Sequence, residues 1–486
     1  MSRDRELELK LAVAPKDATR LESVRPLTIE PKSCQVQESV YFDTAERDLG
    51  KAGLTLRVRR SGASLTQTLK TRVKGVGLFD RQEWEIPVRA MKPELEKAPA
   101  EPLGHLLREA AEMLRPVAKF RVKRTSWEIN GHASMIEISL DKGVVSAGGR
   151  TRKLSELELE LKHGSQKALF DLCRTIAKRV PLRLEVLSKA ELAEAMAEGK
   201  LEKPRKAPRV HLRPERTVAE GFTQIVLSCL RHFRLNEDLL VKRRDPEALH
   251  QLHVALRRLH SVFLLFRPVV RGRRCRRHTR QMQRFGSMLG RARNLDTFIG
   301  LDEPPETPRK VIRRRNAAYD KVIETLDSPR VPRLFLSILR WLFVGKWRLR
   351  SAADASLEAF ISWRLEQSWT RLVHETPARH ISTMGDRSRH RFRLRIKHFR
   401  YALDFSRRLR RGSKQSRKAF TRALEDLQEQ LGLLNDRSIA RRLAADTGHW
   451  VPGLRDPQIN SELLEAAECA FAELTERGPY WREQMA

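Results

Sequence analysis

The first 190 residues alternate between hydrophobic and polar positions with a period of two. Runs of this kind begin at six places: Glu6, Leu54, Leu65, Arg81, Met135 and Glu156. Period two puts successive side chains on opposite faces of an extended chain, so these runs predict strands with one apolar and one polar face. Helical spacing interrupts them near residues 102–115 and 165–180. The N-terminal part is therefore predicted to be mainly a β-sheet.

From Pro214 onward the hydrophobic period changes to 3.6, which is typical of amphipathic helices. Nine such segments are expected, near residues 216–236, 245–266, 273–299, 308–326, 331–348, 354–374, 386–410, 414–446 and 460–478. A basic, Pro-containing stretch over 201–213 reads as a linker. We thus expect an α+β protein with a β domain over 1–200 and an all-α bundle over 214–486.

Composition narrows the class of protein. The chain has 486 residues, of which 40% are hydrophobic, so there is enough apolar material for packed cores. No run approaches the roughly 18 apolar residues of a membrane-spanning helix, and the N-terminus lacks the apolar segment of a signal peptide. The five cysteines are scattered without a CxxC pair. These features disfavour a membrane protein, a disulfide scaffold and a cysteine zinc site, and they predict a cytoplasmic protein.

The charge is strongly positive and unevenly distributed. The chain has 96 Lys and Arg against 61 Asp and Glu, a net charge of +35. Residues 201–486 carry 59 of these basic residues and 32 of the acidic ones, which is a net +27. Such a field suits a polyanion such as nucleic acid, a membrane surface or a phosphate polymer. The alternative interpretation is a solvated basic surface with no partner.

The polar faces of the predicted strands are charged at nearly every second position. Glu6, Glu8 and Lys10 share one face of the first run, and Glu156, Glu158 and Glu160 share one face of the last. Neighbouring carboxylates repel each other unless a hard divalent cation such as Mg²⁺ or Mn²⁺ lies among them. Arginines and lysines across the same cavity would bind phosphate oxygens. A barrel with these faces inside is a charged tunnel; a sheet with an exposed charged face is the alternative.

The order of these motifs resembles the CYTH superfamily, the triphosphate tunnel metalloenzymes, over residues 3–198. The motifs are Glu6-Leu-Glu-Leu-Lys10, Tyr41-Phe-Asp-Thr44, Leu56-Arg-Val-Arg59, Lys70, Arg81-x-Glu-x-Glu85, Glu137-Ile-Ser-Leu-Asp141 and Glu156-Leu-Glu-Leu-Glu160. The resemblance implies an antiparallel eight-stranded β-tunnel that binds a triphosphate and cleaves it with a divalent metal.

The resemblance also implies roles for individual residues. Glu6, Glu8 and Glu160 look like ligands of the main metal, with Glu156 and Glu158 supporting the metals or orienting water. The catalytic set is then Glu6, Glu8, Lys10, Glu158 and Glu160, and the expected substrate-binding residues are Arg57, Arg59, Lys70, Arg81, Arg124 and Lys189. Arg124 belongs to an extended segment that begins at Lys119. Its side chain is expected to point inward because Trp127 and Ile129, at odd positions of that segment, should pack outward. Ser188-Lys189 matches a late family motif, although the residues that follow it depart from the family.

Two segments of the helical half echo each other. His250, His253, Arg257 and His260 lie at spacings of three and four, and His390, Arg393, Lys397, Arg400 and Tyr401 repeat the pattern. Each is followed by a Leu-Gly pair, at Leu289-Gly290 and Leu431-Gly432, which suggests an internal duplication.

These segments resemble the CHAD domain, the conserved-histidine α-helical domain, over residues 214–480. The resemblance implies binding of inorganic polyphosphate by His250, Arg257, Arg258, His390, Arg393, Lys397 and Arg400. Two positions depart from the family: His253 replaces its usual Arg, and Asn294 its usual Asp. The first departure weakens phosphate binding at neutral pH, because histidine is only partly charged there.

Together these features predict a divalent-metal-dependent hydrolase of inorganic triphosphate with a polyphosphate-binding helical domain. Two alternatives stay open. The tunnel could act on thiamine triphosphate, on a nucleoside triphosphate or in ATP cyclisation, or the chain could be a non-catalytic polyphosphate-targeting protein. An RNA- or DNA-binding protein is disfavoured because no nucleic-acid motif is present. The sequence does not predict the oligomeric state.

Overall fold

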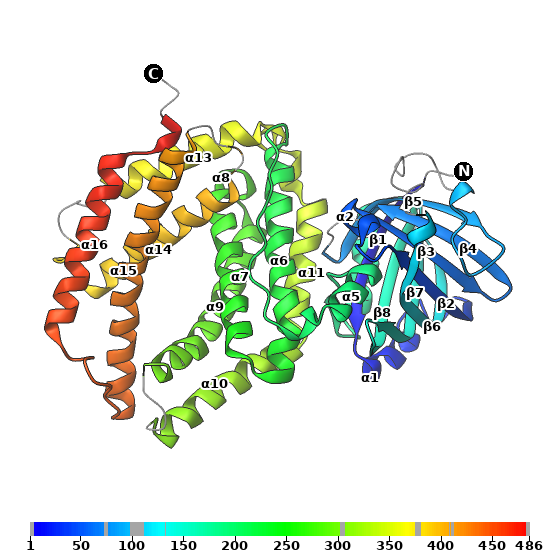
Figure 1. The fold of residues 1–486 in the computed structure, drawn as a ribbon, viewed down its shortest axis with the longest axis horizontal. Helices are drawn as coiled ribbons and strands as arrows, with labels where there is room; N and C mark the ends of the chain where they lie inside the picture. The colour runs from blue at the N-terminus through cyan, green and yellow to red at the C-terminus, as the bar shows by residue number, and fades with distance from the viewer. Residues whose placement is uncertain are drawn as a thin grey trace. The chain divides into compact units, whose positions relative to one another are not determined.

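The computed structural model describes residues 4–71, 76–97, 111–131, 133–301, 307–374, 381–407, 409 and 413–482. The chain divides into two compact units (Figure 1). The first, here called the tunnel unit, contains the chain up to Pro204 together with Thr325–Gly345. The second, the helical unit, contains Arg205–Glu324 and the chain from Lys346 onward.

The tunnel unit is built on an antiparallel sheet. Its strands are β1 (Asp4–Val13), β2 (Lys32–Asp43), β3 (Leu54–Ser61), β4 (Ser64–Thr71), β5 (Leu78–Pro87), β6 (Arg115–Gly131), β7 (Ser134–Ala147), β8 (Arg150–His163) and β9 (Leu182–Leu184). The order is β5-β4-β3-β2-β6-β7-β8-β1-β9, and β1 also pairs with β5. This extra pairing closes eight strands into a ring and leaves β9 as a short ninth strand. The predicted α+β class with an antiparallel β domain is confirmed.

The period-two pattern explains the two faces of the sheet. Leu9 and Leu11 of β1 and Leu157 and Leu159 of β8 are fully buried on the outer face, and the helix α4 (Gln166–Ala177) packs against β8. All six predicted runs lie in strands. β2 and β6 were not among these six runs, although β6 alternates between buried and exposed positions over residues 118–123.

The two predicted helices of this domain had different outcomes. The segment 165–180 forms α4, with Ser165 as its N-cap. Most of the segment 102–115 lies outside the described residues, and its described part is the 3-10 turn Ala111–Met113 followed by the start of β6.

A helix lies against the inner face at one end of the ring. α5 (Lys189–Ala197) begins with a capping box between Ser188 and Glu191. Its residues Ala193 and Met196 join a buried cluster with Tyr41 and Phe120. α5 therefore covers this end of the tunnel and puts Lys189, its first residue, at the interior.

In its described part the helical unit begins with an irregular stretch before α6 and then consists of helices joined by loops and turns. The longer helices are α6 (Val218–Arg243), α7 (Pro246–Leu265), α9 (Arg273–Ile299), α10 (Arg309–Asp327), α13 (Leu357–His374), α14 (Asp386–Phe405), α15 (Lys414–Thr447) and α16 (Pro457–Arg477). Short helices are α8 (Arg267–Val270) and α12 (Ser351–Asp354). The predicted all-α region is confirmed. None of the helices described here combines the length and apolar character needed to cross a bilayer.

One helix from the C-terminal half belongs to the tunnel unit. α11 (Arg330–Val344) packs against α4 and β9. The rings of Phe343 and Phe170 stack with centroids 6.2 Å apart. The Arg340 guanidinium lies 3.0 Å from the Asp171 carboxylate, and Arg333 donates to the backbone oxygen of Ala177 near the end of α4. This helix is therefore part of the hydrophobic exterior of the barrel.

Candidate active site and anion-binding site

Strand register brings three carboxylates together inside the tunnel. Glu8 of β1 lies opposite Glu160 of β8, and Glu160 lies opposite Glu137 of β7. These three residues are here called the acidic row. Lys162 Nζ lies 2.7 Å from Glu160 Oε1 and 3.2 Å from Glu137 Oε2. Glu6 follows the same alternation on β1, but its side chain is outside the described residues.

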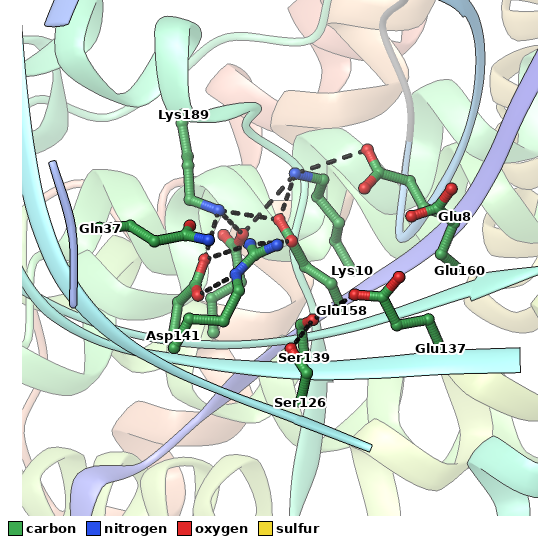
Figure 2. A network of polar contacts seen from close by, with 12 residues as sticks. Glu8, Lys10, Gln37, Ser126, Glu137, Ser139, Asp141, Glu158, Glu160 and Lys189 are labelled. Atoms are coloured by element: carbon green, nitrogen blue, oxygen red, sulfur yellow. Dashed lines mark hydrogen bonds and ion pairs between the residues drawn. The ribbon is translucent and has the colours of Figure 1, made fainter. Parts of the chain in front are cut away.

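Beside the acidic row lies a second group of charges, here called the ion-pair network (Figure 2). It contains three bases and three acids: Lys10, Arg124, Lys189, Asp141, Glu156 and Glu158. Lys10 Nζ lies 2.7 Å from Glu158 Oε1, and Lys189 Nζ lies 2.8 Å from the same oxygen. Arg124 donates to both oxygens of Asp141 and to Glu158 Oε2, each at 2.7 Å. The formal charges of the network balance.

Burial and neighbouring charge set the protonation of this network. Although burial alone favours the protonated acid, Lys10 and Lys189 hold the pKa of Glu158 well below its usual range. Burial raises the pKa of Glu156 to about 7, and its Oε1 accepts no hydrogen bond within the described residues. Despite burial, Lys189 and Arg124 lower the pKa of Asp141 to about 2. The network thus contains one acid that titrates near neutral pH next to two that are ionised there.

Across the ring, β3 and β4 provide cations. Arg57 Nη2 donates to Thr68 Oγ1 at 3.0 Å, and Lys70 Nζ lies 2.7 Å from Glu83 Oε2. The Nε atoms of Arg57 and Arg59 are buried without a hydrogen-bond partner in the described structure. Burial, together with the charges of Arg57 and Arg124, lowers the pKa of Arg59 to about 10. A buried guanidinium whose Nε has no hydrogen-bond partner would be stabilised by a bound anion.

The structure brings most of the predicted tunnel residues together inside the ring of eight strands. Glu8, Lys10, Glu158, Glu160 and Glu156 come from β1 and β8, with Arg57, Arg59 and Lys70 on β3 and β4. Arg124 and Lys189 both lie in the ion-pair network. Arg81 is opposite Glu6 in the β1–β5 register, and its side chain is outside the described residues.

Sequence reasoning overlooked Asp141 and Glu137 as site residues. Asp141 joins Glu156 and Glu158 in the one group of three carboxylates, among the residues the structure describes, whose oxygens lie within 4.8 Å of one another. The signal was present: Glu137, Ser139 and Asp141 follow the same period-two alternation as the chosen glutamates.

In the helical unit, α7, α9, α14 and α15 meet around a group of cations. α7 packs against α9 and α14, and α15 packs against both of these. The group, here called the cation cluster, contains Arg257, Arg293, Arg393, Lys397 and Arg400. Asp436 of α15 lies 3.7 Å from Arg393 Nη2, and Asp404 lies 3.8 Å from Arg400 Nη1. Positive charge therefore exceeds negative charge at this largely buried cluster.

Close helix packing positions a histidine at this cluster. His253 Nε2 lies 3.1 Å from Arg257 Nε. A Cβ atom on Gly290 of α9 would come within 3.3 Å of His253 Cε1, so the Leu-Gly pair of the sequence permits this approach. Burial and the charge of Arg257 lower the pKa of His253 to about 2. His253 is therefore neutral at physiological pH.

Two of the predicted polyphosphate-binding residues have polar partners outside the cation cluster. The guanidinium of Arg258 lies 4.9 Å from the ring centroid of Phe405 and donates to the backbone oxygen of Pro208 at 3.5 Å. His390 Nδ1 makes a 2.9 Å hydrogen bond with Asn435 Oδ1. Arg257, Arg393, Lys397 and Arg400 belong to the cation cluster, and His250 interacts with it electrostatically.

Comparison with known proteins agrees with this division of the chain. The CYTH domain model matches residues 4–192 and the CHAD domain model matches residues 224–445. An inorganic triphosphatase of Haemophilus influenzae is 31% identical over 188 residues, which are 38% of this chain and 53% of that protein. The match thus spans about half the length of that relative.

Solved structures give weaker likenesses. The CHAD domain of the plant Ricinus communis is 27% identical, with a TM-score of 0.44, and the match covers 57% of this chain and 93% of the plant domain. A putative adenylyl cyclase from Hippeastrum with a dominant triphosphatase activity is 20% identical, with a TM-score of 0.31, covering 39% of this chain and 96% of that one. On the two family matches, the chain carries a CYTH domain followed by a CHAD domain.

Proposed function

We propose that the tunnel unit hydrolyses inorganic triphosphate to diphosphate and phosphate with the help of a divalent cation. The observation that carries this proposal is the placement of the acidic row and of the buried arginines on facing strands of one closed ring. The inorganic triphosphatase relative supports the choice of substrate, since its match falls within the length of a CYTH domain.

Phosphoryl transfer depends on charge neutralisation and in-line geometry more than on a protein nucleophile. Arg57 and Arg59 would bind phosphate oxygens, because their Nε atoms have unused hydrogens in the described structure. Lys70 and Arg81 would extend this contact along the substrate. Lys10 and Lys189 would orient Glu158, which they hold ionised.

The carboxylates in the tunnel fit a hard divalent cation. The acidic row offers only oxygen donors, which Mg²⁺ and Mn²⁺ prefer. Bases also line this part of the tunnel: Lys162 lies next to Glu160 and Glu137, and Lys10 Nζ lies 3.5 Å from Glu8 Oε1. Glu8 and Glu160, with Glu6, would therefore hold the cation, and Glu156 and Glu158 lie next to it. A cation bound there would neutralise phosphate oxygens and activate water.

Glu8→Gln tests this assignment. We expect kcat/KM for triphosphate with Mg²⁺ or Mn²⁺ to fall roughly 100-fold or more, because the variant removes a charged ligand while keeping its size. Glu38→Gln is the matched control, since Glu38 pairs with Lys119 outside this site. Phosphate release that survives in Glu8→Gln would exclude the metal assignment.

The choice of substrate is tested by a panel. Triphosphate, thiamine triphosphate and ATP are compared at equal metal concentration, and we expect the highest kcat/KM for inorganic triphosphate. A preference for an organic triphosphate would support the alternative tunnel activity. If the wild-type chain turns over none of them with any divalent metal, the non-catalytic alternative would replace the hydrolase.

We propose further that the helical unit binds inorganic polyphosphate at the cation cluster. The five cations of this cluster, three of which interact with Asp436, favour a flexible polyanion, whose successive phosphates can each meet a cation. The full-length chain and its Arg393→Gln variant are compared for retention on a polyphosphate matrix and on RNA at matched salt. We expect preferential retention on polyphosphate and its loss in the variant; stronger retention on RNA would overturn the proposal.

A further inference from the structure

Lys397 lies at the centre of the cation cluster. On α14 it is one turn from Arg393 and from Arg400, while α7 presents Arg257 and His253 to it. The acid that faces it is Asp436 of α15. Within the described part of the chain its ammonium makes no ion pair closer than 4.0 Å and no hydrogen bond.

Of the cations gathered here, lysine is the one that can give up its charge. An arginine guanidinium stays protonated in proteins, whereas a buried lysine readily loses its proton. Burial, reinforced by Arg257 and Arg393, lowers the pKa of Lys397 to about 6. Without a ligand the site therefore relieves its excess charge at neutral pH by leaving this amine uncharged.

We propose that Lys397 takes up a proton from solvent when polyphosphate enters the cation cluster, so that the helical unit binds the polymer and a proton together. This inference rests on the proposed binding of polyphosphate at this site. Each internal phosphate brings about one negative charge, which reverses the local field and favours the ammonium form. No bond other than N–H forms, and the proton comes from buffer or water.

Other titratable groups face the same place and must be separated from Lys397. They are His250 and His253 on α7, His398 and Tyr401 on α14 and Asp436 on α15, with Arg257, Arg293, Arg393 and Arg400 as permanent charges. Burial lowers the pKa of His398 to about 4 and that of His253 to about 2. At pH 8.5 these histidines are neutral in the empty protein, and the Lys397→Arg variant separates their contribution from that of the lysine. Proton uptake at that pH that is lost in this variant therefore reports on the lysine.

Linkage gives the sign of the pH effect. When the bound state holds one more proton than the free state, the association constant falls about tenfold per pH unit between the two pKa values. We therefore expect polyphosphate affinity to weaken about tenfold from pH 7 to pH 8.

The test is titration calorimetry of the full-length chain with polyphosphate of defined length, in EDTA so that metal-dependent turnover is absent. Measurements at pH 8.5 in two buffers of different ionisation enthalpy give the number of protons taken up. We expect about one for the wild type, none for Lys397→Arg or Lys397→Met, and an unchanged number for Lys418→Arg, which alters an exposed lysine of α15. Lys397→Arg should also bind with little dependence on pH between 7 and 8.

The outcomes separate the two proposals. Binding by the wild type without proton uptake would overturn the role of Lys397 and leave polyphosphate binding intact. Uptake that persists in Lys397→Arg would assign the proton to another group and overturn it as well. If the wild type binds no polyphosphate at pH 6 or at pH 8.5, the binding proposal and this inference both fail. Circular dichroism of each variant confirms that it is folded.

Discussion

Two adjacent arginines of α7 have different surroundings. Arg257 lies in the cation cluster beside His253, whereas Arg258 is buried with its guanidinium over the ring of Phe405 and against the linker carbonyl of Pro208. On a helix, neighbouring residues are separated by about 100°, so one can face a ligand while the next packs inside. Charge alone therefore does not identify the binding residues.

This difference gives a prediction for alanine variants. Arg258→Ala should lower the free energy of unfolding by roughly 2 kcal/mol, because it removes a buried stem and a cation–π contact. Arg257→Ala should weaken polyphosphate binding while leaving the free energy of unfolding unchanged or higher, since it relieves crowding of like charges. Urea unfolding and calorimetry measure the two effects. A larger loss of stability in Arg257→Ala would contradict this reading.

At the residue scale the sequence predicted which strands carry charged side chains. It was less informative about which of these side chains contact one another. Period-two alternation correctly placed Glu8, Lys10 and Glu158 on the charged face of their strands. It did not reveal that Lys10 and Lys189 contact the same oxygen of Glu158, because these residues are far apart in the chain. Such a contact depends on the closed ring and on α5, neither of which is a local property.

At the scale of elements, α11 is the feature that the hydrophobic pattern described least completely. The pattern predicted a helix over 331–348, and α11 ends at Val344. The sequence pattern of a strongly amphipathic helix indicates that one face is buried, but it does not indicate which elements cover that face. Here the covering elements are α4 and β9, about 150 residues earlier in the sequence. The domain boundary expected near residue 200 thus leaves part of the tunnel unit out.

Leu339→Asp tests whether α11 stabilises the tunnel unit. Leu339 is fully buried, and its side chain comes within 3.2 Å of the position a Cβ atom on Gly77 would take. A buried, unpaired carboxylate should destabilise the unit by roughly 3 kcal/mol or more. Hydrogen exchange of β9 and β1 should then become faster. Ser337→Asp, at an exposed position of the same helix, is the control and should have a smaller effect.

At the scale of the whole molecule, buried neutral histidines make stability depend on pH. Burial lowers the pKa of His232, His278 and His398 to about 4. In the unfolded chain these groups titrate near 6.5. The unfolded state therefore binds more protons than the folded state between pH 6.5 and 4, and the free energy of unfolding falls as the pH is lowered through that range.

We expect each such histidine to lower the free energy of unfolding by roughly 3 kcal/mol between pH 7 and pH 4, because its pKa is about 2.5 lower in the folded than in the unfolded chain. The helical unit should therefore unfold in mild acid. Denaturant titrations between pH 7 and 4 measure the slope, and His278→Gln should reduce it. His211→Gln, which alters an exposed histidine, should not. An unchanged slope in His278→Gln would show that this group is protonated in the folded state.

The pairing of β1 with β8, β5 and β9 has a consequence for synthesis of the chain. β1 is made first, but its partner in the acidic row is made about 150 residues later, and β9 later still. A nascent chain that ends before β8 has two unsatisfied strand edges and lacks Glu160, one of the three carboxylates of the acidic row. Closure of the barrel and assembly of the acidic row are thus the same event, and a ribosome-bound fragment cannot complete the candidate site before β8 has been made.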